Sequence, residues 1–201
     1  MFLTLHDLQH DYVRARGGDL VARHVRLLEA YRSTSPGRVL HAVDADGYFY
    51  EHIARHVRDG EGPVALRSML FDHRWLAAKL KATGVNALLS DFELLDLASD
   101  KPLRLLRDAL RLSAHVLSQH PEELSPQLLG RLRGVSEPEF QHLCARVEAA
   151  TALPALMPVW STLQPPGGSL RRTLVGHADQ VEAVALSADG KTAIPLMSRR
   201  R

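Results

Sequence analysis

The sequence predicts a mainly α-helical fold in which short antiparallel helices stack on one another, followed by a short β segment. Apolar residues make up 45% of the 201 residues but aromatic residues only 5%, so Leu, Val and Ala must fill the core. Leu and Ala are strong helix formers. Apolar residues recur at helical spacing up to about residue 150. After Pro154, prolines and glycines become frequent, and the closing segment has the pattern of short strands.

The first half of the chain is expected to consist of helices separated by glycines and prolines. A helix over residues 4–16 ends at Gly17-Gly18, and Asp19 caps a second helix that runs to about Tyr31. Further helices are expected from about Asp46 to Arg58, over residues 64–83 as two short helices or one bent helix, and from a cap at Asn86 to about Leu95.

The strongest helix prediction covers residues 102–119, with Pro102 in the first turn. Two apolar stripes run along this segment, so it is expected to lie between neighbouring helices rather than on a surface. One stripe is Leu103, Leu106, Leu110, Ser113 and Leu117, and the other is Leu105, Leu112 and Val116. Shorter helices are expected from Ser125-Pro126 to Gly130 or Gly134, and from Ser136 to about Ala150.

The β segment is predicted from alternating apolar residues that flank a turn. Strands are expected over Arg172–Val175 and Val181–Leu186, and Ser187–Gly190 is a hairpin turn before Thr192–Ile194. The predicted organisation is therefore a helical arm over residues 1–160, a Pro/Gly linker over 161–170, a partial β unit over 171–194 and a basic tail over 195–201.

Composition excludes several classes of function. The net charge is +2, which gives no broad positive field for a nucleic-acid partner. No stretch approaches the roughly 18 apolar residues of a membrane span, and the N-terminus lacks the basic start of a signal peptide. A single cysteine, Cys144, excludes an intrachain disulfide. We therefore expect a cytoplasmic protein with neither nucleic-acid nor membrane partners.

Candidate catalytic patterns fail on their context. Ala185–Thr192 fits a loose phosphate-loop pattern, but the following Pro195 prevents the helix that such a loop must open. His52 and His56 have a spacing that can hold a metal, but the residue after His52 is not the Glu of a zinc protease. Cys144 is expected to be a buried, inert thiol. The sequence predicts no catalytic, cofactor-binding or metal site, and no cofactor.

The stretch Leu174–Gly190 resembles the opening of a WD repeat, with the Gly176-His177 pair and the Asp189-Gly190 turn at the spacing of that family. A complete blade needs four strands over about 40–45 residues and closes with a Trp-Asp pair, which this stretch does not reach. The resemblance implies structural roles for these four residues in an incomplete propeller blade. In the family, the histidine usually bonds an aspartate later in the blade, and that aspartate is absent.

The helical part is similar to the arm of apoptotic protease-activating factor and its bacterial NB-ARC relatives. Three stretches carry the resemblance: Leu5–Gln9, Tyr48–His56 and Leu66–Lys79. The resemblance implies an armadillo-like, superhelical arm that joins an NB-ARC ATPase, missing upstream of Met1, to a WD-repeat propeller, missing downstream of Arg201. The order of arm, linker and Gly-His pair agrees with this arrangement.

We therefore expect a non-catalytic structural and protein-interaction module of a signal-transduction protein, and a truncated gene product. Its partners would be proteins, including the full-length NB-ARC/WD-repeat parent. Trp160, beside the linker, either holds the arm against the first blade or packs locally. A free-standing helical adaptor and a small helical enzyme are the alternatives.

Overall fold

The computed structural model describes residues 18–150, 158–171, 173, 181–189 and 192–197. These residues form eight α-helices, three short 3-10 helices and one β-hairpin, so the mainly α fold is confirmed. The α-helices are α2 (Leu20–Thr34), α3 (Phe49–Glu61), α4 (Pro63–Leu70), α5 (His73–Thr83), α6 (Val85–Phe92), α7 (Lys101–Leu117), α8 (Leu124–Leu132) and α9 (Pro138–Ala150). The 3-10 helices are η1 (Pro36–Arg38), η2 (Leu40–Ala42) and η3 (Pro121–Glu123), and the strands are β1 (Val181–Leu186) and β2 (Ala193–Met197).

The predicted helix over residues 4–16 lies outside the described residues, and so does the predicted strand Arg172–Val175 except for Thr173, which is not in a strand. The predicted strand Val181–Leu186 is confirmed with the same bounds. The strand after the turn continues to Met197, three residues beyond the predicted boundary at residue 194. Pro195 fits there because the strand pairs on one side only, so its missing N–H costs little.

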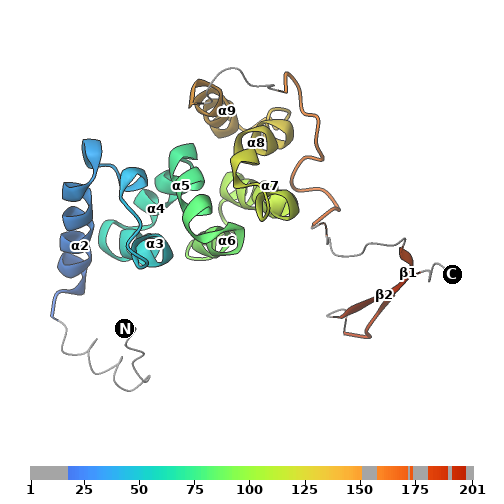
Figure 1. Cartoon of the computed structure of the whole chain (residues 1–201), viewed down its shortest axis with the longest axis horizontal. Coiled ribbons are helices and arrows are strands. Elements are labelled where there is room, and N and C mark those ends of the chain that lie inside the picture. Colours follow the sequence, from blue (N-terminus) through green and yellow to red (C-terminus); the bar gives the residue numbers. More distant parts are fainter. Residues whose placement is uncertain (1–17, 151–157, 172, 174–180, 190–191, 198–201) are drawn as a thin grey trace.

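The helices follow one another through space in chain order, with α2 at one end of the arm and α9 toward the other (Figure 1). Each α-helix packs against the next one along the chain, from α2 through α9. Helix α5 also contacts α3 and α9, so it lies in the middle of the stack. This arrangement is the predicted stack of short helices. The β-hairpin lies apart from the helices (Figure 1).

Two glycines join consecutive helices without a loop between them. Gly62 (φ +92°) ends α3 and precedes α4, and Gly84 (φ +83°) does the same between α5 and α6. Both have a positive φ, which glycine adopts without a steric penalty. The prediction that Asn86 caps a helix to about Leu95 is wrong. Gly84 occupies the cap position one residue before α6 begins, and the helix ends at Phe92.

Aspartates cap three other helices. The Asp19 side chain accepts a hydrogen bond from the backbone N–H of Ala22 at 3.0 Å, as predicted. Asp72 and Asp100 cap α5 and α7 in the same way. Such caps satisfy backbone donors that have no partner within the helix.

The core confirms the predicted position of residues 102–119 between other helices. Leucines of both apolar stripes are buried on α7, and the helix packs against α6 and α8. On α5, Trp75 is 1% exposed and stacks on Tyr50 of α3, with ring centroids 5.6 Å apart. The predicted burial of Cys144 is also confirmed.

One ion pair lies inside this apolar core. Lys79 of α5 is fully buried, and its Nζ lies 3.1 Å from a carboxylate oxygen of Asp91 on α6. Nζ also donates to the backbone carbonyl of Tyr50 on α3. Burial raises the pKa of Asp91 to about 6, although the nearby ammonium group lowers it. A single ammonium group thus connects three helices.

Candidate functional site: the linker on the helical arm

The Pro/Gly segment that follows the helices is held on the surface of α8. The carbonyl of Gly130 accepts hydrogen bonds from the backbone N–H groups of Thr162 (3.0 Å) and Leu163 (2.9 Å), and from the hydroxyl of Ser161 (3.0 Å). Gly130 lies in the last turn of α8, where carbonyls have no partner within the helix. The linker therefore completes the hydrogen bonding of this helix end.

Close approach of the linker depends on Gly130 having no side chain. A Cβ atom at this position would lie 3.0 Å from the Leu163 side chain and 3.2 Å from the Thr162 hydroxyl. Any larger residue would push the linker outward. Sequence analysis identified this glycine only as a possible helix end, so its packing role was missed.

Arg131 joins α7, α8 and the linker through its guanidinium group. Nε donates to the Ser113 hydroxyl at 2.8 Å and Nη1 donates to the carbonyl of Gln164 in the linker at 2.8 Å. Nη2 donates to the carbonyl of Leu112 and to the Gln127 side chain, both at 3.4 Å. The residue is 6% exposed, and burial lowers the pKa of the guanidinium. It stays charged at neutral pH, because arginine starts from a very high pKa.

Further contacts extend the attachment along the whole described linker. At its start, Arg133 donates to the carbonyl of Pro158, and at its end Nε of Arg111 donates to the carbonyl of Arg171 at 3.2 Å. Between them, Gly167 (φ +86°) lies against α7, where a Cβ atom would come within 2.9 Å of the Leu105 side chain. Residues 158–171 therefore form a strap, attached to α7 and α8 at both ends and in the middle.

The structure describes only some of the residues predicted to matter in the β segment. Gly176, His177 and Gly190 lie outside the described residues. Asp189 lies in the turn, where its carboxylate accepts a hydrogen bond from the Ser187 hydroxyl at 2.5 Å. Trp160 is 74% exposed on the strap, and its contact with a first blade stays a prediction.

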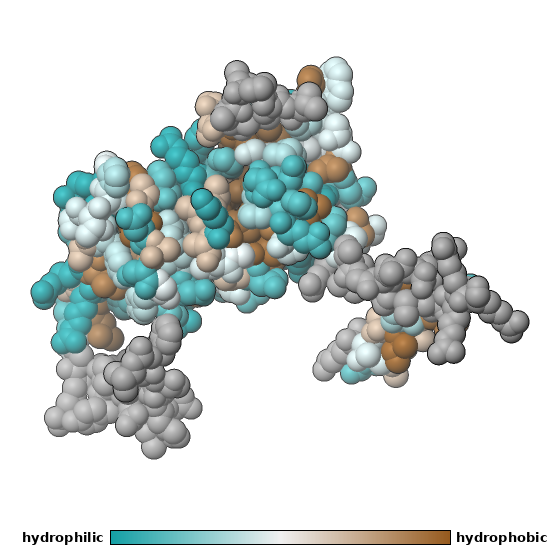
Figure 2. Space-filling model, viewed as in Figure 1, coloured by the Kyte–Doolittle hydropathy of each residue, from teal (hydrophilic) through white to brown (hydrophobic). Residues whose placement is uncertain are grey.

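The hairpin is apolar on both faces. The strands pair in the register Ala183↔Leu196 to Leu186↔Ala193. Because side chains alternate across a strand, Ala183, Ala185, Ile194 and Leu196 share one face, and Val184, Leu186, Ala193 and Pro195 share the other. The large apolar side chains among them are 58–71% exposed. Figure 2 shows this apolar surface on the isolated hairpin.

The described residues contain no cluster of three or more His, Cys, Asp or Glu side chains that could hold a metal. His52 and His56 belong to no such cluster among the described residues. His56 instead shares a hydrogen bond with His24 of α2, with 2.7 Å between the two Nδ1 atoms, and its Nε2 lies 2.7 Å from the Tyr48 hydroxyl. Within the described part of the chain, no helix is long and apolar enough to cross a membrane.

Comparison with known proteins identifies the family of the helical arm. The sequence profile of the APAF-1 helical domain matches residues 20–129, slightly more than half of the chain. The chain belongs to the APAF-1 helical-domain family. This domain is a structural module rather than a catalytic one. The match extends from the start of α2 into α8 and ends just before the glycine that holds the strap.

Two curated proteins are similar to part of the chain. The chain is 30% identical over 135 residues to NACHT domain- and WD repeat-containing protein 1 of Mus musculus, covering 62% of this chain and 9% of the mouse protein. It is 33% identical over 127 residues to the Homo sapiens protein of the same name, covering 58% and 8%. The matched segment thus spans less than a tenth of the length of either relative. No solved structure matches the chain significantly.

Proposed function

We propose that this APAF-1-like arm is a non-catalytic spacer that links a nucleotide-binding ATPase domain to a WD-repeat propeller in a signal-transduction protein. Its partners are then proteins, chiefly the domains on either side of it, and its location is cytoplasmic. The arm sets the distance between the two domains through the packing of its helices. The strap over residues 158–171 sets the direction in which the chain leaves it.

The attached strap is the observation that carries this proposal. A flexible Pro/Gly linker would leave two domains free to turn independently of one another. Here the guanidinium of Arg131 and the carbonyl of Gly130 hold the linker on α7 and α8, and the last described attachment is at Arg171. A linker held in this way would pass movement of the arm on to the domain that follows.

The two-sided apolar hairpin supports a propeller as the following domain. A sheet that is apolar on one face buries it against one neighbouring element, whereas this hairpin needs a neighbour on each face. A propeller blade packs between two neighbouring blades around a central channel, and so meets that requirement. The name of both relatives includes a NACHT domain and a WD repeat, which supports a WD-repeat propeller as one of the neighbouring domains.

The native size of the protein tests the linking role most simply. An antibody raised against residues 40–120 would be used for an immunoblot of cells that make the protein, with the purified 201-residue chain as the size marker. The proposal predicts a band several times heavier than 22.3 kDa, because the arm would be part of a larger protein. A single band at the position of the marker would contradict it and favour a free-standing adaptor. The same blot tests the prediction of a truncated gene product, which requires a band at the position of the marker.

A further inference from the structure

A cavity of about 550 Å³ lies where η2, the turn between α4 and α5, and the end of α9 meet. Its polar lining comes from all three elements, and the remaining lining residues are small aliphatic ones. The polar residues are His41, Ser68, Asp72, His73, Arg74 and Arg146. The volume is in the range of small-molecule sites, and no part of the proposed spacer role uses this cavity.

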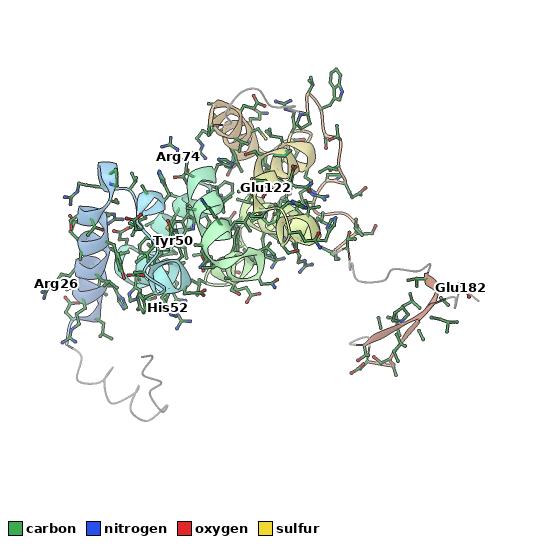
Figure 3. The ribbon with its side chains drawn as sticks, in the orientation of Figure 1. Arg26, Tyr50, His52, Arg74, Glu122 and Glu182 are labelled. Carbon is green, nitrogen blue, oxygen red and sulfur yellow. The ribbon has the colours of Figure 1, made fainter. Side chains whose placement is uncertain are left out.

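Positive charge dominates the cavity. Arg146 is held in place because its Nη2 donates to the carbonyl of Phe71 at 2.8 Å, at the end of α4. The exposed guanidinium of Arg74 has no hydrogen bond or ion pair among the described residues, and Figure 3 shows it projecting beside α9. The one acidic group, Asp72, is already engaged: it lies 3.6 Å from His41 and caps α5 through the N–H of Arg74.

A buried imidazole completes the lining. His73 is 9% exposed, and its Nε2 lies 2.9 Å from the Ser125 hydroxyl. Its Nδ1 has no hydrogen-bond partner among the described residues. Burial lowers the pKa of the imidazole, so the ring is neutral at physiological pH and adds a polar group without repelling either charge. His73 is also the first residue of α5, whose N-terminus carries partial positive charge.

We propose that this cavity binds a small molecule that carries a phosphate group, with Arg74 and Arg146 as the phosphate contacts. Guanidinium groups match phosphate oxygens with paired, charge-assisted hydrogen bonds. One guanidinium is fixed by Phe71 and the other has no partner among the described residues, which leaves donors free for such a ligand. The lining has no large apolar side chain to anchor a peptide, which favours a small anion. The source of the phosphate group is either inorganic phosphate or a nucleotide.

The test is an NMR titration of the full 201-residue chain, which follows the arginine Nε–H signals. Inorganic phosphate and ATP would be added separately, with chloride added to a reference sample at the same ionic strength. The expected result is a saturable shift of the Arg74 and Arg146 signals with at least one probe. An affinity for ATP at least tenfold higher than that for inorganic phosphate would identify a nucleotide as the ligand. Equal affinities for the two probes would show that the cavity recognises the phosphate group alone. No saturable shift with either probe would overturn the proposal.

Two variants separate a built site from general charge attraction. Arg74→Gln removes the unpaired guanidinium, and because the residue is exposed the fold should be retained. It is expected to weaken binding by about tenfold or more, as the loss of a charge-assisted contact does. Arg26→Gln makes the same charge change on an exposed arginine of α2, outside the cavity, and is expected to leave binding unchanged. Equal weakening by both variants would contradict the proposed site.

Discussion

Replacing Lys79 with methionine is expected to lower the free energy of unfolding by about 3–5 kcal/mol at about pH 7.5. The ammonium group of Lys79 is fully buried, pairs with Asp91 at 3.1 Å and donates to the carbonyl of Tyr50. Methionine fills a similar volume without a charge. Asp91 then remains in apolar surroundings without its ammonium partner, and this unpaired buried carboxylate is the larger part of the cost.

The cost should depend on pH, because Asp91 can escape it by taking up a proton. Its pKa is about 6 in the folded protein, compared with an ordinary value of 3.8 in the unfolded chain. Because folding raises this pKa, protonation of Asp91 stabilises the folded protein. The stabilisation is complete below about pH 3.8 and is lost as the pH rises through about 6. The free energy of unfolding changes by about 3 kcal/mol over this range. Removing the Lys79 charge raises this pKa further. At about pH 5 the variant therefore keeps Asp91 protonated and recovers part of the lost stability.

Urea denaturation followed by far-UV circular dichroism at both pH values measures the effect. Lys81→Met is the matched control, since Lys81 is an exposed lysine of the same helix, and it should change stability by no more than about 0.5 kcal/mol. The double variant Lys79→Met with Asp91→Leu should recover most of the loss, because a buried pair replaced by apolar residues is often neutral. A cost for Lys79→Met below about 1 kcal/mol at about pH 7.5, or an equal cost at both pH values, would refute this reasoning.

Three other substitutions test the caps, the hairpin and the strap. Asp100→Ala removes the cap of α7 and the ion pair with Arg67 at 2.5 Å, and should cost about 1–2 kcal/mol in urea denaturation; no measurable change would count against the cap. Leu186→Lys combined with Ile194→Lys should raise solubility, measured by precipitant titration, and should leave the melting temperature of the arm unchanged because both side chains are largely exposed. A lower melting temperature would indicate an unrecognised contact. Gly167→Ala combines a positive φ with a close approach to α7, so limited proteolysis should cut residues 158–171 faster than in the unchanged protein; an equal rate would argue against tight packing there.

Much of the helical architecture could be predicted from local patterns. The two leucine stripes over residues 102–119 predicted a helix between neighbours, and α7 is that helix. Asp19 identified the start of a helix because capping depends on residues close in sequence. The prediction of a cap at Asn86 was wrong because Gly84, two residues earlier, already occupies the cap position. Gly84, with its positive φ, ends α5 and also stands directly before the first residue of α6.

The features that depend on tertiary packing could not be predicted in this way. Composition identified a Pro/Gly linker over residues 161–170, but its attachment requires Arg131 and Ser113, which meet only after α7 and α8 pack together. An arginine in the apolar run between Leu129 and Leu132 was the available signal, since a charged residue there must find partners or solvent. The cavity beside α9 could not be predicted either, because its lining comes from three separate segments that meet only in the folded protein.

The central claim is that the linker is a strap fixed to the arm, and amide hydrogen exchange at Thr162 and Leu163 tests it most directly. Both N–H groups donate to the carbonyl of Gly130, so NMR-detected exchange should be protected well below the rate of an unstructured chain. Arg131→Met, which removes the bond to the linker carbonyl of Gln164, should raise exchange at both positions while α3 and α5 stay protected. Exchange at the unstructured rate in the unchanged protein would contradict the strap, and with it the proposed transmission of movement from the arm to the next domain.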